Sequence, residues 1–168
     1  SRKVAVVSAT GSTRMGHQVG LAVAERFGHC ILELGGNNAM IVAPSADLEM
    51  ALRANVFSAV GTAGQRCTSL RRLIVHGSVY DKLLPRLKQA YSGLPIGSPL
   101  EAGTLVGPLI DDGARAAMEN ALEQAKADGG AVFGGSRALE DKFPKAAYVK
   151  PAIVEMPGQS GIVCHETF

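Results

Sequence analysis

Short apolar runs alternate with segments of helical period along this chain of 168 residues, and glycines stand at the boundaries between them. Glycine opens turns and ends helices because it adopts backbone angles that other residues avoid. The chain has 20 glycines and no long glycine-rich tract, which indicates many tight turns and no disordered linker. Strand and helix alternating in this way predict an α/β fold with a mainly parallel sheet.

The expected helices carry apolar residues at steps of three and four, and the expected strands are short apolar runs. In the first helix the stripe is Met15, Val19, Val23 and Phe27, and Gly28 is expected to end it. Ser78 followed by Asp81 reads as a capping box at the start of a later helix. Strands are expected at 4–8, 30–34, 39–42, 73–76, 131–133 and 149–154, and later helices at 44–60, 78–91 and 112–128.

Charge and composition exclude several classes of protein. The formal net charge of +2, from 17 basic and 15 acidic residues, argues against a nucleic-acid-binding surface. No stretch approaches the roughly 18 apolar residues that a membrane span needs, and the first apolar run is too short for a secretory signal. Three irregularly spaced cysteines do not form a disulfide framework, so a reducing, cytoplasmic setting is expected. No cysteine or histidine pair has the spacing of metal ligands.

Gly11 and Gly16 bracket the turn between the first expected strand and the first helix. Glycine lets the backbone approach a phosphate, and the N–H groups at the start of a helix bind an anion. The turn lacks the lysine of a P-loop and the third glycine of a dinucleotide-binding fingerprint. Two interpretations therefore stay open, a phosphate site and a glycine turn with an ordinary Ser or Thr cap.

Cys67 stands among polar residues in the segment Gly-Thr-Ala-Gly-Gln-Arg-Cys-Thr, at 61–68. An adjacent cation such as Arg66 lowers the pKa of a thiol from about 8.5 toward neutrality and favours the nucleophilic thiolate. The two glycines before it would let a substrate carbonyl approach backbone N–H groups, as an oxyanion site requires. A partly exposed structural cysteine is the alternative interpretation.

Glu33 interrupts the apolar run at 31–34, close to the C-terminal end of the second expected strand. Open α/β sheets place their chemistry at that end of their strands. If Glu33 is buried there, burial raises its pKa and makes it a useful general base near neutral pH. The alternative is a solvent-facing glutamate on an edge strand.

Together these segments resemble the aldehyde dehydrogenase superfamily over the whole chain. The phosphate-type turn at 9–16, the glutamate motif at 32–38 and the cysteine motif at 64–68 stand in the family's order, and Glu33 and Cys67 have the family's separation. Residues 166–168 resemble the start of the family's Glu-x-Phe motif. The chain starts beside an apolar run and stops without a terminal signal, which suggests a segment of a longer polypeptide.

The glutamate and cysteine motifs, with Arg71 and Arg72 after them, resemble the antiquitin branch, whose members oxidise α-aminoadipic semialdehyde. Succinylglutamate semialdehyde dehydrogenases share parts of this signature and are the nearest rival. Methylmalonate semialdehyde dehydrogenases share the Gln-Arg-Cys and less of the rest. The resemblance thus implies oxidation of a carboxylated semialdehyde, in a parent enzyme of lysine catabolism that is a homo-oligomer, either dimer or tetramer.

The resemblance also implies roles for individual residues. Cys67 would attack the aldehyde, Glu33 would activate the water that releases the acid, and Arg66, beside Thr68, would bind the substrate carboxylate. The cofactor would be NAD, with NADP not excluded. Ser12 and its turn would hold the pyrophosphate, Leu34 would offer its carbonyl to the carboxamide, and the last motif would meet the nicotinamide and its ribose. The expected cofactor-binding residues are thus Gly11, Ser12, Gly16, Leu34, Glu166 and Phe168.

On this resemblance, residues 1–34 are the C-terminal part of the Rossmann-like NAD(P)-binding domain, and residues 35–168 are a catalytic domain that is incomplete at its C-terminus. Two other functions remain as alternatives. One is a truncated segment that binds a nucleotide or a partner without turnover. The other is a hydrolase that uses Cys67 and Glu33 without a cofactor.

Overall fold

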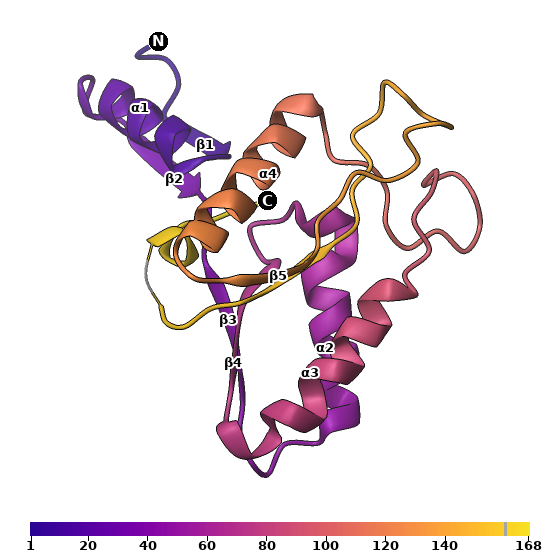
Figure 1. Cartoon of the computed structure of the whole chain (residues 1–168). Coiled ribbons are helices and arrows are strands. Elements are labelled where there is room, and N and C mark those ends of the chain that lie inside the picture. Colours follow the sequence, from indigo (N-terminus) through magenta and orange to yellow (C-terminus); the bar gives the residue numbers. More distant parts are fainter. Residues whose placement is uncertain (160) are drawn as a thin grey trace. The chain divides into compact units, whose positions relative to one another are not determined.

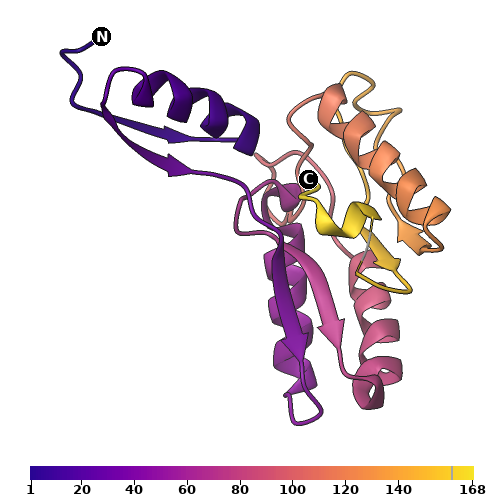
Figure 2. The ribbon, with the colours of Figure 1, turned by 90° about the vertical axis from the view of Figure 1, so that its left-hand side faces the viewer.

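The computed structural model describes residues 1–159 and 161–168 and contains both strands and helices (Figures 1 and 2). The expected alternation of strand and helix holds only in part, because two strands follow each other at two places and two helices at one. The chain divides into two compact units, Ser1–Gly36 and Asn37–Phe168, which are described separately below. The division falls two residues after the expected domain boundary. The elements are β1 (Val6–Thr10), α1 (Thr13–Ala24), β2 (His29–Glu33), β3 (Asn38–Val42), α2 (Leu48–Val60), β4 (Leu70–Val75), α3 (Gly77–Ser92), α4 (Asp112–Ala127), β5 (Ala131–Gly134) and β6 (Ala152–Glu155), with 3₁₀ turns η1 (Gly61–Gly64) and η2 (Gly161–Cys164).

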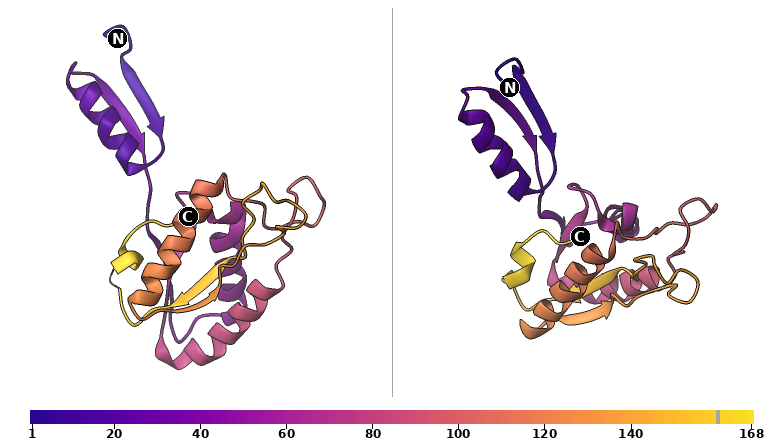
Figure 3. Two further views of the ribbon diagram at one scale, coloured as in Figure 1. Left: turned by 45° about the horizontal axis from the view of Figure 1, so that its top comes forward. Right: turned by 90° about the horizontal axis from the view of Figure 1, so that it is seen from above.

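The first unit is a β–α–β motif. Strands β1 and β2 pair in parallel, and α1 lies along them (Figure 3). The pairing runs from Val6 with His29 to Thr10 with Glu33, so both strands end at the same level. The N–H of Gly11 continues this pairing by donating to the carbonyl oxygen of Glu33 over 3.0 Å. The glycine turn and the end of the glutamate strand are therefore neighbours.

The expected end of the first helix is wrong. Helix α1 stops at Ala24, where the N–H of Gly28 donates to Val23 O and that of Phe27 donates to Ala24 O. This is the bonding of a Schellman motif, in which the residue before the final donor is left-handed. Phe27 occupies that position with a φ of 56°, and its side chain is 95% exposed. Phe27 thus ends the helix, a role usually taken by glycine, and is not part of the apolar stripe.

The second unit contains one parallel and one antiparallel strand pair. Strands β3 and β4 are parallel, with α2 as the crossover between them, while β5 and β6 are antiparallel. No helix lies between β5 and β6, and an antiparallel pair needs no helical crossover. The α/β class with mainly parallel pairing is confirmed. However, the strands in the described residues form three separate pairs, whereas one sheet was expected.

The second unit has three clusters of buried apolar residues, and in one of them, where α2 and α3 cover the β3–β4 pair, Val42, Val79 and Leu83 are buried. The capping box expected at Ser78 is wrong, because helix α3 begins one residue earlier. Its cap is His76, whose Nδ1 accepts from the N–H of Ser78. Among the described residues, no helix is long and apolar enough to cross a membrane.

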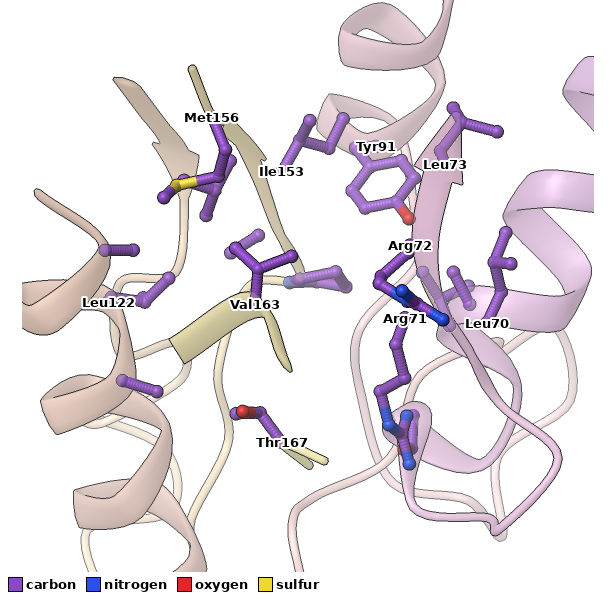
Figure 4. A pocket seen from close by; sticks show the side chains of 18 of the residues that line it. Leu70, Arg71, Arg72, Leu73, Tyr91, Leu122, Ile153, Met156, Val163 and Thr167 are labelled. Carbon is purple, nitrogen blue, oxygen red and sulfur yellow. The ribbon is translucent and has the colours of Figure 1, made fainter. Parts of the chain in front are cut away.

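A cavity of about 410 Å³ lies within the second unit (Figure 4). Apolar side chains from several elements line it, among them Leu73, Leu122 and Ile153. Arg71 and Arg72 stand along the β4 side of this cavity, and the C-terminal segment contributes Thr167. The cavity thus borders both the strand that follows the cysteine loop and the expected Glu-x-Phe motif.

Candidate active site

Cys67 lies in the turn between η1 and β4, with an exposed free thiol. Three residues in succession before it, Thr62, Ala63 and Gly64, have φ values of 53°, 53° and 72°. A left-handed conformation costs roughly 1–2 kcal/mol for a residue other than glycine. The chain therefore stores strain in the turn that presents the thiol, and strain of this kind is typical of functional sites.

Polar side chains hold the backbone of this turn. The Nδ2 of Asn38, at the start of β3, donates to the carbonyl oxygens of Cys67 (2.6 Å) and Ser69 (2.9 Å). The hydroxyl of Ser69, which is 2% exposed, accepts from the N–H of Arg66 over 3.1 Å. The N–H of Ser69 in turn donates to Arg66 O over 3.1 Å. These bonds fix the peptides on both sides of Cys67.

Arg71 binds the same turn from β4. Its Nη1 donates to Gly64 O (2.9 Å) and its Nη2 donates to Arg66 O (2.8 Å). The guanidinium also lies 3.7 Å from the Glu166 carboxylate, and its Cζ lies 4.5 Å from the centre of the Phe168 ring. Burial lowers the pKa of Arg71, while the Glu166 carboxylate and the Cys67 thiolate oppose that shift. Arg71 thus joins the cysteine loop to the expected cofactor motif.

The polar residues near Cys67 in the sequence differ in their exposure to solvent. Arg66 and Thr68 are exposed, whereas the side chain of Arg71 is only 8% exposed. Arg71 interacts electrostatically with Cys67, while Arg66 stays open to solvent. The assignment of Arg66 and Thr68 to substrate binding remains a prediction.

The sequence interpretation missed four residues that position the turn. Gln65 donates to the carbonyl oxygens of Thr62 and Pro108 and accepts from the N–H of Ile110 over 2.8 Å, so it ties the turn to a distant loop. For Asn38 and Gln65 the available signal was a polar residue inside the glutamate or cysteine motif, but nothing in the sequence says which carbonyl such a side chain meets. The four missed residues are Asn38, Gln65, Ser69 and Arg71.

The first unit carries the glutamate and the phosphate-type turn. Glu33 is the last residue of β2 and is exposed, so this unit does not provide the burial considered from the sequence. Ser12 is the N-cap of α1 and accepts from the N–H of Met15 over 3.2 Å. Gly16 is buried, and a Cβ there would lie 2.5 Å from Leu34 Cδ2. Gly16 thus serves close packing of α1 on the segment that follows β2.

The same turn also fits a phosphate. The first turn of α1 contains no acidic side chain, so no carboxylate competes for its N–H groups. The cap at Ser12 uses its hydroxyl as an acceptor, which leaves the hydroxyl hydrogen for another acceptor. Both interpretations drawn from the sequence, an ordinary cap and a phosphate site, are compatible with this geometry.

Comparison with known proteins identifies the family. A model of the aldehyde dehydrogenase family matches residues 1–168. The chain belongs to the aldehyde dehydrogenase family. It is 46% identical to an α-aminoadipic semialdehyde dehydrogenase of Rattus norvegicus over 167 residues, which are 99% of this chain and 30% of that protein. It is 44% identical to the aldehyde dehydrogenase family 7 member B4 of Arabidopsis thaliana, over 99% of this chain and 32% of that relative.

Solved structures agree with this assignment. A 3,6-anhydro-L-galactose dehydrogenase in complex with NAP superposes with a TM-score of 0.94 and is 33% identical, over 99% of this chain and 35% of that one. A betaine aldehyde dehydrogenase of Staphylococcus aureus in complex with NAD⁺ gives a TM-score of 0.93 at 28% identity, over 98% of this chain and 33% of that one. The chain spans about a third of the length of the relatives it matches. In the part that the structure describes, no three His, Cys, Asp or Glu side chains are grouped to hold a metal.

Proposed function

We propose that the protein containing this chain oxidises a carboxylated semialdehyde, of the α-aminoadipic type, to the corresponding acid with a nicotinamide cofactor. The observation that carries the proposal is the cysteine turn, in which an exposed thiol stands on a backbone fixed by Asn38, Ser69 and Arg71. The identity with relatives named α-aminoadipic semialdehyde dehydrogenase supports this substrate class. Succinylglutamate semialdehyde is the rival substrate.

The residues present fit part of a nicotinamide dinucleotide. The turn around Gly11, Ser12 and Gly16, at the start of a helix of 12 residues, would receive the pyrophosphate. Leu34 O would bind the carboxamide, Glu166 would bind the nicotinamide ribose, and Phe168 would pack beside the ring. When bound, the cofactor would supply the acceptor for the substrate's hydride. We propose NAD as the cofactor, with NADP as the alternative.

In the proposed mechanism the Cys67 thiolate attacks the aldehyde carbon and forms a thiohemiacetal. The backbone N–H of Cys67 stabilises the oxyanion of that adduct, and the turn holds the N–H in place before the reaction begins. After oxidation the acyl group remains on Cys67 as a thioester. Glu33 takes a proton from the water that attacks this thioester, and the acid leaves with the thiolate restored. Arg66, flanked by Thr68, binds the carboxylate of the substrate through two parallel hydrogen bonds.

The experiment uses the full-length protein that contains this sequence. The absorbance of the reduced nicotinamide is followed with a panel of semialdehydes and plain aliphatic aldehydes, with NAD and with NADP. Cys67→Ala is expected to abolish oxidation, whereas Cys30→Ala, which removes another exposed thiol, is expected to retain it. Oxidation by Cys67→Ala at the parent rate would end the proposed mechanism.

The substrate class has a separate test in Arg66→Ala. It is expected to lose about 1.5–3 kcal/mol of transition-state stabilisation on carboxylated semialdehydes, the range for hydrogen bonds to charged groups. Plain aliphatic aldehydes are expected to react at nearly the parent rate. An equal loss on both classes would show that Arg66 does not read the carboxylate.

We also infer that the parent enzyme is a homo-oligomer in the cytoplasm. Free cysteines at Cys30, Cys67 and Cys164 support a reducing compartment. Large apolar side chains at Ile41 and Phe57 are exposed in this chain, which supports burial against other parts of the enzyme or another copy. Light scattering of the full-length protein tests the oligomer, and a monomeric mass would refute it.

A further inference from the structure

Arg71 makes two hydrogen bonds to carbonyl oxygens that flank Gln65 in the cysteine turn. Its Nη1 meets Gly64 O and its Nη2 meets Arg66 O, over 2.9 and 2.8 Å. A planar guanidinium presents its donors in a fixed fork, so two such bonds set the separation and direction of both carbonyls. Arg71 therefore fixes the backbone immediately before Cys67.

The carbonyl of Arg66 and the N–H of Cys67 belong to one peptide. No cis peptide bond occurs in the described residues, and in a planar trans peptide the C=O and N–H point in opposite directions. Arg66 O accepts from Arg71 Nη2 and also from the N–H of Ser69. With the carbonyl held on one side, the N–H of Cys67 is aimed at the opposite side.

The charge on Arg71 adds to this geometric effect. A hydrogen bond from a cation is about twice as strong as a neutral one, and it polarises the peptide that accepts it. Polarisation makes the N–H at the other end of the peptide a better donor. The same guanidinium also interacts electrostatically with Cys67.

The other charged groups near the turn have different positions. Arg66 is exposed and screened by solvent. Arg72 points its donors at Asn37 O and at Gln159, away from the turn. Glu166 lies 3.7 Å from Arg71 and balances its charge. Of these cations, Arg71 alone bonds to the peptide of the nucleophile.

We propose that Arg71 is a positioning residue for the nucleophile: its fork holds and polarises the Arg66–Cys67 peptide, and its contacts with Glu166 and Phe168 link that peptide to the segment expected to meet the nicotinamide. This inference rests on the proposed function, since it takes Cys67 as the nucleophile. It assigns to Arg71 the support of the thiolate that the sequence attributes to Arg66.

The test compares R71Q and R71K in the full-length protein, with R72Q as the matched control on the same strand. Alkylation of Cys67 by iodoacetamide, followed by mass spectrometry against pH, reports the thiolate without substrate or cofactor. R71Q is expected to move the midpoint of alkylation upward by about one pH unit, because a neighbouring cation is lost. It is also expected to lower kcat roughly tenfold or more, because the oxyanion donor is less well held.

R71K separates charge from geometry. Lysine keeps the charge but has no planar fork, so the alkylation midpoint should stay near the parent value while kcat still falls. R72Q removes a guanidinium that also bonds to a backbone carbonyl, and it should leave the alkylation midpoint unchanged. If R71Q does not fold, the alkylation profile and kcat of R71K test whether Arg71 positions the nucleophile.

Two results would overturn the inference. One is a folded R71Q protein with the parent alkylation profile, and the other is R71K with the parent kcat. The proposed function fails differently, when Cys67→Ala retains oxidation or the parent oxidises no aldehyde. In that case the alkylation profile still reports whether Arg71 acts on Cys67.

Discussion

Gly16 and Gly20 lie one turn apart on the face of α1 that packs against β2 and Leu34, and the space around them differs. A Cβ at Gly16 would lie 2.5 and 2.6 Å from the two δ-carbons of Leu34 and 3.1 Å from its Cγ. A Cβ at Gly20 would lie 3.7 Å from Leu32 Cδ1, an ordinary van der Waals contact. The same substitution by alanine is therefore expected to have opposite effects at the two positions.

The magnitudes follow from two opposing effects. Alanine in place of glycine inside a helix gains about 0.5–1 kcal/mol. Nothing opposes this gain at Gly20, so Gly20→Ala should stabilise the helix by nearly that amount. At Gly16 the overlap forces Leu34 or the helix to move, and such overpacking costs about 1–3 kcal/mol. Gly16→Ala should therefore destabilise the unit by about 1 kcal/mol in net.

The double mutant identifies the cause. Leu34→Ala removes the overlapping atoms, so Gly16→Ala made in that background should become stabilising, with a coupling energy of about 1–3 kcal/mol. Native-state hydrogen exchange of the α1 amides in the full-length protein measures this local stability, and it does not require the whole enzyme to unfold in one step. A Gly16→Ala protein protected as well as Gly20→Ala would refute the argument from Leu34.

Three further predictions concern the stability of the second unit and are checked by denaturation of the full-length protein. Leu83→Ala should cost about 2–5 kcal/mol because Leu83 is buried in the core, while exposed Met50→Ala should change stability by less than about 0.5 kcal/mol. Lys88, at 2.6 Å, lowers the pKa of Glu155, so the carboxylate contributes stability above its unfolded pKa and loses it as pH falls. Glu155→Gln should therefore lower the melting temperature at neutral pH and flatten its decline in acid; an unchanged pH profile would contradict this. Thr62→Gly should raise stability by about 0.5–1 kcal/mol, since it relieves a left-handed φ, and a loss would show that strain is absent there.

The helices were largely predictable because their ends carry local chemical signals. The helix expected at 112–128 is found at Asp112–Ala127, with Asp111 as its cap and a left-handed Gly129 after it. Strand pairing was not predictable in the same way. The antiparallel partnership of β5 and β6 depends on which strand edges meet, and no residue in either strand encodes that choice.

The candidate site shows the same division between local and distant information. Motif spacing predicts Cys67 and Glu33 as catalytic residues, because each lies within a short pattern of glycines and polar residues, and their roles remain a prediction. Asn38 could not be assigned, since its amide bonds to carbonyl oxygens of residues 67 and 69, far away in sequence. A hydrogen bond from a side chain to a backbone carbonyl cannot be predicted from the type of the accepting residue, because every residue has that carbonyl.

Arg66 and Arg71 show why closeness in sequence is a poor guide to the cation that serves a thiol. Within the turn, the N–H of Ser69 donates to Arg66 O, which reverses the chain and brings β4 back along the residues before Cys67. The side chain that returns over the loop is Arg71, whereas Arg66 is left on the outside. Burial makes a cation's field stronger, and exposure leaves a guanidinium available to a carboxylate from solution. We therefore propose that two arginines divide the roles that the sequence assigned to Arg66, with Arg71 supporting Cys67 and Arg66 binding the substrate carboxylate.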